Sequence, residues 1–248
     1  MTRPSVTDGA PYWDALAARY GQLYDSVWSR FEDAIVQLDL MNALPCCGTH
    51  RVLDIGCGTG LGYELLVAAG LTVHYVGLDV SREMLKLFRE RRPEVRTVEG
   101  SGDNLSAFFR AQEFDFVMSL NAACSFVPDT RRMLQAIASL LVPGGRVYLS
   151  FLNKFSLRRL LRFKREAVEN YRSRGDQLSD SSVRALTYTA TDLKRLLNEA
   201  GFVDVSFVYR SVLGGVWETS RAVRVERLLM NAVPRLGHTL TVIGRCTE

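Results

Sequence analysis

The chain has 248 residues, of which 47% are hydrophobic, and a formal net charge of +4. This composition suffices for a sizeable core, and the length suits a single α/β domain. No apolar run approaches the length of a membrane-spanning helix, and the N-terminus lacks the apolar core of a signal peptide. The five cysteines show no C-x-x-C or other zinc-binding spacing. We therefore expect a cytoplasmic protein with reduced cysteines and no bound metal.

Residues 11–44 carry aromatic side chains on helical spacing, among them Tyr12 and Tyr20. From these residues alone, the segment is interpreted as an amphipathic helix that packs its aromatics on the edge of a sheet. A role in binding depends on the motifs that follow it.

Residues 51–62 combine an apolar strand, an acidic residue and a glycine-rich turn. The strand is apolar enough to be buried on both faces of a parallel sheet. Gly56, Gly58 and Gly60 then let the backbone turn sharply and approach a ligand closely, because they have no Cβ. The turn leads directly into a predicted helix, which is the context that makes such a motif credible.

The glycine spacing argues against a dinucleotide. The fingerprint G-x-G-x-x-G/A requires a small residue where Leu61 or Tyr63 stands. Asp54, two residues before the first glycine, would repel a pyrophosphate but attract a cationic amino group. The run V-L-D-I-G-C-G-T-G closely resembles motif I of the class I S-adenosylmethionine-dependent methyltransferases. The resemblance implies that the three glycines approach the cofactor and that Asp54 orients its amino end.

Residues 73–79 read as a second strand that ends in Asp79, and a helix opens at Ser81. A carboxylate at this position accepts the ribose hydroxyls of a nucleotide cofactor. The resemblance therefore implies that Asp79 binds the ribose and that Met84, in the helix, also contacts the cofactor. The alternative is that Asp79 is only a helix-capping residue.

The third strand, residues 95–98, leads into a loop with Asp103 and Asn104. The resemblance implies that these two residues bind the adenine. A plain loop aspartate is the alternative interpretation of Asp103, because the loop carries an extra glycine.

The fourth strand, residues 114–120, is followed by the sequence Asn-Ala-Ala-Cys. Ligands of open α/β sheets bind beyond the carboxyl ends of the strands, so Leu120 is a candidate cofactor contact, and Asn121 and Cys124 are candidate substrate contacts. The N/D-P-P-Y/F motif of nucleic-acid and glutamine N-methylating relatives is absent here. Cys124 as a nucleophile competes with its interpretation as a small buried thiol.

The remaining elements complete a doubly wound, seven-stranded, mostly parallel Rossmann-like sheet. A helix at 129–141 ends at a Pro-Gly-Gly turn, and the fifth strand follows it and leads to Asn153, a further candidate substrate contact. A helix from 191 and strands at 203–208 and 240–245 follow. We divide the chain into an N-terminal helical lid (1–50), a cofactor-binding core (51–151), a basic helical cap insertion (152–190) and the C-terminal part of the sheet (191–248), with a helical insertion at 209–238.

The segments outside the core are expected to select the substrate. In the small-molecule branch of the family, an N-terminal helix closes over the cofactor. The resemblance implies this lid role for Tyr12, Arg19 and Tyr20, with Arg19 pairing the methionine carboxylate. In the insertion at 209–238, Trp217 either lines the acceptor site or covers the sheet. None of the three histidines is placed at a reaction centre by a motif.

Residues 154–174 contain eight Lys or Arg and two Glu, so this segment carries a net charge of +6. Leu160, Leu161, Val168 and Tyr171 are interpreted as one apolar side of a helix. The segment fits an anionic substrate or carrier, an anionic membrane surface, RNA phosphates, or a solvated face without a partner.

We expect S-adenosylmethionine-dependent methyl transfer to a small-molecule acceptor, such as an anionic or lipid-like natural product, by SN2 alignment. A general base is not required for every acceptor, so no catalytic residue is assigned. The alternatives are an RNA methyltransferase that uses 154–174 and a non-catalytic cofactor-binding scaffold. Nicotinamide oxidation is disfavoured by the glycine spacing. The oligomeric state is not predicted.

Overall fold

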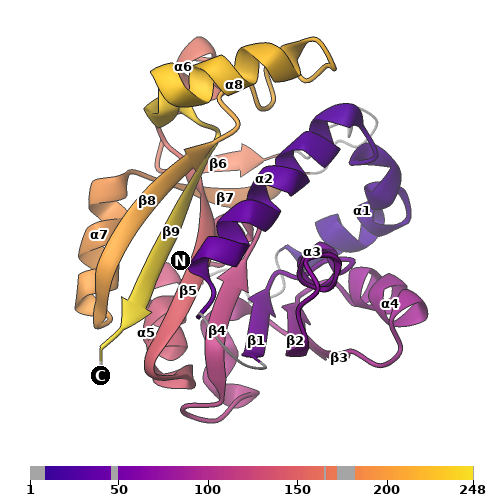
Figure 1. Ribbon diagram of the computed structural model, residues 1–248, viewed down its shortest axis with the longest axis vertical. Helices are drawn as coiled ribbons and strands as arrows, with labels where there is room; N and C mark the ends of the chain where they lie inside the picture. Colours follow the sequence, from indigo (N-terminus) through magenta and orange to yellow (C-terminus); the bar gives the residue numbers. More distant parts are fainter. Residues whose placement is uncertain (1–8, 46–49, 165, 172–181, 248) are drawn as a thin grey trace, which may run out of the picture.

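The computed structural model describes residues 9–45, 50–164, 166–171 and 182–247. Their centre is a twisted sheet with the core order β3-β2-β1-β4-β5-β9-β8 (Figure 1). The first five strands in this order are parallel, β9 runs antiparallel to β5, and β8 runs antiparallel to β9. The core strands are β1 (His50–Ile55), β2 (Val73–Asp79), β3 (Arg96–Glu99), β4 (Phe114–Ser119), β5 (Leu141–Asn153), β8 (Phe202–Arg210) and β9 (Thr239–Cys246).

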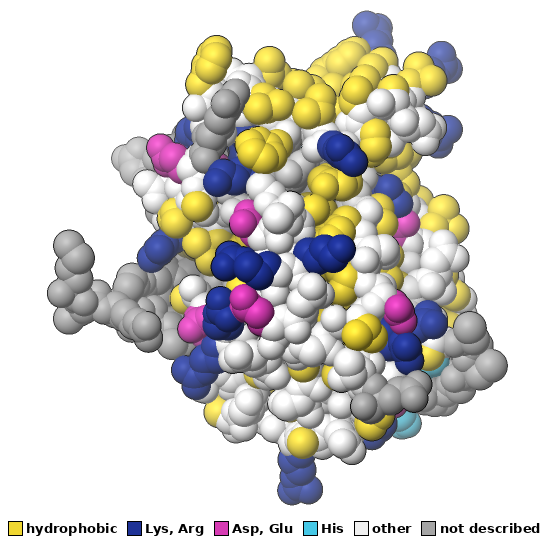
Figure 2. All heavy atoms as spheres, turned by 90° about the vertical axis from the view of Figure 1, so that its left-hand side faces the viewer, with side chains coloured by type: hydrophobic (Ala, Val, Ile, Leu, Met, Phe, Trp, Pro, Cys, Tyr) yellow, Lys and Arg dark blue, Asp and Glu magenta, His cyan; other side chains and the backbone are white. Residues whose placement is uncertain are grey.

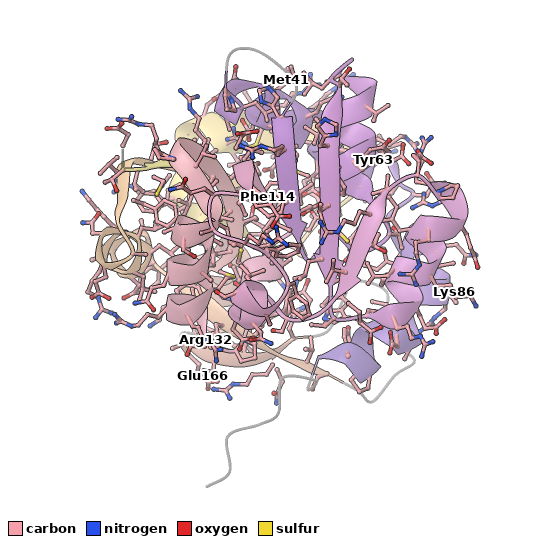
Figure 3. All side chains as sticks on the ribbon, turned by 90° about the horizontal axis from the view of Figure 1, so that it is seen from below. Met41, Tyr63, Lys86, Phe114, Arg132 and Glu166 are labelled. Carbon is pink, nitrogen blue, oxygen red and sulfur yellow. The ribbon has the colours of Figure 1, made fainter. Side chains whose placement is uncertain are left out.

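Helices cover both faces of the sheet, as Figure 3 shows from below. Met133 and Ile137 of α5 pack with Leu193 of α7 in the larger apolar cluster, on one face. Leu66 of α3 and Phe88 of α4 belong to a second cluster, on the other face. The covering helices are α3 (Leu61–Ala68), α4 (Arg82–Arg91), α5 (Thr130–Leu140) and α7 (Ala190–Glu199). The prediction of a doubly wound α/β sheet is confirmed.

Two helices precede the sheet. The first, α1 (Ala10–Leu23), contacts α4, and the second, α2 (Val27–Ala43), packs on α3 and β5. Ser26 caps α2 by accepting a hydrogen bond from the backbone N–H of Ser29 at 3.0 Å. The chain thus returns over the carboxyl edge of the parallel strands before the sheet begins.

The insertion after β5 differs from its prediction. Only α6 (Leu157–Leu161) is helical, while β6 (Val168–Tyr171) and β7 (Val183–Tyr188) form an antiparallel hairpin. β7 also pairs with the end of β5, so the sheet has nine strands over the described residues. The predicted helix through Val168 and Tyr171 is wrong because β7 alternates buried and exposed residues and supplies the ladder partners that β6 needs. Part of the basic segment, at 165 and 172–174, lies outside the described residues.

The insertion after β8 contains α8 (Ala222–Ala232), within the helical insertion predicted at 209–238, and the short 3-10 helix η3 (Pro234–Leu236). Two other 3-10 helices follow strands of the core, η1 (Gly102–Ala107) after β3 and η2 (Ala123–Phe126) after β4. None of the helices in the described ranges is long and apolar enough to span a membrane.

Candidate functional site

The glycine-rich turn leaves β1 at the carboxyl edge of the sheet. Gly56, Gly58 and Gly60 have φ angles of +75°, +53° and +97°, a region that favours glycine. A Cβ on Gly56 would lie 2.5 Å from Ala123, and one on Gly60 would collide with the ring of Phe88. A Cβ on Gly58 would meet nothing within 4 Å. The outer glycines are therefore required by packing, and the middle one faces open space.

Asp54 lies beneath this turn and is only 1% exposed. Its Oδ2 accepts a hydrogen bond from the Tyr75 hydroxyl at 2.6 Å, while the buried Oδ1 has no hydrogen-bond partner among the described residues. Gly62 makes room for the carboxylate, because a Cβ there would collide with Asp54 and Met118. Burial raises the pKa of Asp54 from 3.8 to about 7, against the lowering effect of the Tyr75 bond. The site thus holds a buried carboxylate with an unused acceptor oxygen.

Asp79 ends β2 and braces the turn. Its Oδ2 accepts from the backbone N–H of Gly58 at 2.8 Å, and its Oδ1 accepts from that of Ser81 at 2.9 Å. Burial raises its pKa above the usual value, partly offset by these amide bonds. Each carboxylate oxygen has a second lone pair, so both retain capacity for another donor.

Asp103 lies in η1, after β3, and its side chain is buried. Its Oδ1 is also without a hydrogen-bond partner within the part of the chain that the structure describes. The neighbouring Asn104 is partly buried and accepts a long hydrogen bond, 3.5 Å, from Arg132. Met84 is buried in α4. An unpaired buried carboxylate oxygen is costly, so its presence here marks a position where a ligand would supply the donor.

The helix α1 lies over the start of α4. The carboxylate of Asp14 accepts hydrogen bonds from the Ser81 hydroxyl at 2.6 Å and the Glu83 backbone N–H at 3.1 Å. Burial raises the pKa of Tyr20, as do the nearby Tyr171 hydroxyl and Asp79 carboxylate, so Tyr20 lies close to the end of β2. Tyr12 is 5% exposed and packs in an apolar cluster with Val183.

A cavity of about 120 Å³ lies beyond the carboxyl ends of β4 and β5, under α2 and α6. Asn121 and Ala122 have positive φ angles, 49° and 60°, and this strained turn brings both into the cavity wall. The backbone N–H of Ala122 is held by the Ser150 hydroxyl at 3.0 Å. The apolar part of the wall consists of Phe31, Ile35, Val36, Leu120, Tyr148 and Leu152.

Most of the charged side chains around the cavity form ion pairs or hydrogen bonds with other groups of the protein. Arg210 forms a two-point ion pair with Asp39, at 2.7 and 2.9 Å. Glu32 accepts from the Ser211 hydroxyl and Glu218 from the backbone N–H of Gly215. Arg158 instead lies 5.8 Å from the centre of the Tyr171 ring.

Arg158 is unusual among these groups because the described residues offer it no carboxylate partner. The adjacent Arg159, in contrast, is 3% exposed and paired with Glu169. His238 also lines the cavity, and its buried Nδ1 lacks a hydrogen-bond partner among the described residues. Burial, with the charges of the neighbouring arginines, holds the pKa of His238 well below its usual value, so the imidazole is neutral.

Comparison with known proteins identifies the core. The family model described as a methyltransferase domain matches residues 52–145, which run from β1 through the glycine turn to β5. This part of the chain is a domain of the S-adenosylmethionine-dependent methyltransferase family. S-adenosylmethionine is the cofactor of this family.

Curated relatives of the methyltransferase resemble its core. It is 33% identical over 118 residues to a trans-aconitate 2-methyltransferase of Rhodopseudomonas palustris, covering 47% of this chain and 44% of that one. It is 37% identical over 123 residues to a ubiquinone biosynthesis O-methyltransferase of Aromatoleum aromaticum, covering 48% and 51%. The match therefore spans about half the length of these relatives.

Among solved structures, the methyltransferase resembles phosphoethanolamine N-methyltransferase 2 of Haemonchus contortus in complex with S-adenosyl-L-methionine. The TM-score is 0.66 with 16% identical residues, and the alignment covers 99% of this chain and 61% of that one. At this identity the likeness concerns the fold.

The predicted site residues of the methyltransferase fall into three groups: the cofactor residues, the lid residues and the substrate contacts. The residues expected at the cofactor meet at the carboxyl ends of β1, β2 and β3, with Leu120 at the end of β4 and Tyr20 above β2. Tyr12 packs in the apolar core of the lid, and Arg19, on the same helix, is partly buried.

The predicted substrate contacts are mostly elsewhere. Asn121 lines the cavity. Cys124 is fully buried in the main core, and Asn153 donates to the backbone carbonyls of Arg235 and Gly237. Trp217 is 44% exposed and does not line the cavity. The side chain of Cys124 packs in the core, that of Asn153 supports the backbone, and that of Trp217 lies on the surface.

Sequence reasoning missed Asp14, Arg158 and His238 as site residues. Asp14 lies between the predicted lid residues Tyr12 and Arg19, but the first turn of its own helix holds no acidic residue. It meets the start of α4 only in the folded chain, so no local signal marked it. His238 precedes the last strand, with no local motif to distinguish it.

Proposed function

We propose that this methyltransferase transfers the methyl group of S-adenosylmethionine to a small, amphipathic acceptor that carries an anionic group. The observation that carries the proposal is the pair of buried oxygens, on Asp54 and Asp103, that have no hydrogen-bond partner among the described residues. Both residues follow or end strands of the parallel sheet, as does the open glycine Gly58, and a cavity lined by Leu120 lies beyond the end of β4. The curated relatives named for trans-aconitate and ubiquinone biosynthesis support a small-molecule acceptor.

The hydrogen-bonding groups of the site match the polar groups of S-adenosylmethionine one by one. Asp54 suits its ammonium group, Asp79 its ribose hydroxyls, and Asp103 its adenine amino group. Gly58 allows the backbone to approach, and Tyr20 of α1 covers the ribose position. When bound, the cofactor supplies a methyl group already activated on a sulfonium, so the protein chiefly aligns the acceptor and excludes water.

The cavity fits the proposed acceptor because its wall combines apolar side chains with Arg158 and His238. An anionic group on the acceptor would pair with Arg158, which has no carboxylate partner in the described structure. The neutral imidazole of His238 has a free nitrogen to hydrogen-bond the acceptor. The volume of about 120 Å³ suits a small molecule or the end of a longer one.

Cofactor affinity is expected to rise with pH through the titration of Asp54. The folded protein raises the pKa of Asp54 to about 7, so at pH 5.5 the carboxyl is mostly protonated and lacks the charge that attracts the ammonium group. Calorimetry between pH 5.5 and 7.5 should show affinity increasing by about tenfold, and Asp54→Asn should remove most of this dependence. A wild-type affinity independent of pH would refute the role of Asp54.

Stability should change with pH in the opposite direction. Because the pKa of Asp54 is higher in the folded state, about 7, than its ordinary value of 3.8, the folded state binds more protons. The free energy of unfolding of the unliganded protein therefore falls as pH rises from about 4 to about 7. Asp54→Asn should reduce this decline, as measured by thermal unfolding.

Replacement of Arg158 tests the acceptor. With tritiated S-adenosylmethionine and a panel of unsaturated tricarboxylates and aromatic hydroxy acids, Arg158→Ala should lower kcat/KM for the methylated acid by at least about 30-fold. Cofactor affinity should stay the same, because Arg158 lies in the cavity wall and not at the cofactor residues. Arg162→Ala is the matched control, since Arg162 is exposed and does not line the cavity.

The alternatives predict different results in the same assay. An RNA methyltransferase would label total RNA in a strongly salt-dependent reaction and leave the acids unlabelled. A non-catalytic scaffold would bind the cofactor and label nothing. An equal loss for the acid and its uncharged amide analogue in Arg158→Ala would refute pairing of Arg158 with an anion.

A further inference from the structure

The edge of the molecule formed by α6, α8 and the loops next to them exposes several large apolar side chains. Phe163 is 92% exposed, Leu228 71% and Leu161 58%. Val216 and Trp217, just before α8, are also exposed. We name these five residues the apolar edge. Figure 2 shows hydrophobic side chains gathered at this end of the molecule, where α6 and α8 lie in Figure 1.

The two helices that carry the apolar edge are packed together on their inner sides. Leu157 of α6 joins Val223 and Leu229 of α8 around a cluster centred on Trp28, which anchors both helices to α2. Leu161 and Leu228 point away from this cluster and remain exposed. The apolar edge is therefore a surface of a supported unit, with its own core beneath it.

Phe163 combines exposure with an unfavourable backbone. Its φ angle is +53°, a conformation that bulky residues rarely adopt. The turn is held by hydrogen bonds from Phe163 N–H to the Leu160 carbonyl at 3.1 Å and from Lys164 N–H to the Arg159 carbonyl at 2.9 Å. Because the Phe163 side chain is almost fully exposed, its packing within the described protein does not offset the free-energy cost of this backbone conformation. Such uncompensated strain is expected where a side chain contacts an external partner.

The charges around the apolar edge are mostly positive. Between 155 and 171 and between 216 and 236, the exposed cations described are Arg162, Lys164, Arg221, Arg224, Arg227 and Arg235. The exposed acidic residue in these described ranges is Glu166. Glu169 is paired with Arg159, and the buried Glu226 accepts from backbone amides, so neither balances the cations. The rim is strongly cationic.

We propose that the apolar edge and its cationic rim dock the protein onto a membrane surface rich in anionic lipids. Apolar side chains that enter the interface gain from leaving water, and each nearby Lys or Arg adds about 1 kcal/mol of attraction to an anionic surface. The aliphatic members, such as Leu161 and Leu228, distinguish this surface from one made for RNA, where exposed aromatic rings stack on bases and aliphatic chains contribute little.

The docking edge adjoins the cavity. Arg158, in α6, and Gly215 and Glu218, in the loop before α8, line the cavity wall, and Val216 and Trp217 lie between the last two in sequence. A docked molecule would hold the cavity beside the lipid surface, which favours an amphipathic acceptor that resides there. This last step rests on the proposed function, whereas docking itself does not.

Vesicle co-sedimentation without cofactor or acceptor tests the docking. The wild-type protein should bind vesicles of phosphatidylcholine with added phosphatidylglycerol and bind phosphatidylcholine vesicles weakly. The double variant Phe163→Ser, Leu228→Ser should lower this binding by at least about tenfold. Arg221→Glu with Arg224→Glu should lower it and reduce its salt dependence.

Two variants serve as controls: Leu38→Ser, at an exposed position of α2, and Arg110→Glu, at an exposed position of the loop before β4. Both should bind the vesicles as the wild-type protein does. Cofactor affinity of each variant, measured by calorimetry, verifies that the fold is retained. Absence of binding to phosphatidylglycerol vesicles overturns the proposal, and so does binding unaffected by the serine double variant. If the protein instead prefers unrelated RNA to the vesicles, with a salt-dependent affinity that the serine double variant retains, the cationic rim would be a nucleic-acid site. Because no methyl transfer is measured, failure here is distinct from failure of the proposed function.

Discussion

Asp79→Ala should lower the affinity for S-adenosylmethionine by at least about tenfold, a loss of at least about 1.4 kcal/mol. The wild-type carboxylate is assigned to both ribose hydroxyls, and hydrogen bonds to a charged group contribute about 1.5–3 kcal/mol each. The same carboxylate holds the backbone N–H of Gly58 at 2.8 Å, so its loss also loosens the turn that faces the cofactor. Isothermal titration calorimetry measures the effect.

Two further measurements separate binding from folding in this experiment. Asp79→Asn keeps the shape of the side chain but has one acceptor oxygen, so it can retain only one of the two backbone hydrogen bonds, to Gly58 or to Ser81. It should disturb the turn less than Asp79→Ala and still lose affinity, because the charge is gone. Titrations should be run well below the thermal midpoint of each variant. An unchanged affinity in Asp79→Ala would exclude the ribose assignment.

Glu226→Ala should lower the free energy of unfolding by about 2–4 kcal/mol. Glu226 is 1% exposed, and its two carboxylate oxygens accept from the backbone N–H groups of Val212 and Leu213, at 2.7 and 2.8 Å. Truncation leaves both buried amides without a partner. Burial raises the pKa of Glu226, which returns part of the cost when the carboxylate is removed. Urea denaturation measures the change.

Glu226→Gln is the matched control, because its amide oxygen still accepts one hydrogen bond and the loss should be smaller. Glu83→Ala, at an exposed position of α4, should change stability little. The loop held by Glu226 leads into Gly214 and Gly215 of the cavity wall. We therefore also expect the alanine variant to weaken acceptor binding more than cofactor binding. Stability equal to that of the wild type would contradict the anchoring role.

The core strands could be predicted because each is a contiguous run with its own periodicity and its own turn signals. The hairpin of β6 and β7 could not. β6 has only four residues and alternates exposed with half-buried positions, so its own sequence is a weak strand signal. Its ladder partner, β7, is not adjacent to it in the sequence. A short strand of this kind forms only where β7 is already held against the end of β5.

The candidate cofactor residues were predictable for the same reason as the core strands. Asp54, Asp79 and Asp103 each follow or end a strand, and parallel strands bring their carboxyl ends to one edge of a sheet. The acceptor cavity was not predictable. Cys124 and Asn153 stand at strand ends too, but their side chains turn into the core and toward backbone carbonyls.

By itself, the sequence determined the glycine turn between β1 and α3, and with it the cofactor and the fold. Strand, turn and helix are neighbours in the chain, so local geometry specifies them. Only the tertiary structure decided that Gly58 is the glycine with open space and that Arg158 and His238 share a cavity. Those side chains come from segments far apart in sequence, and which face each one meets depends on how separate elements pack.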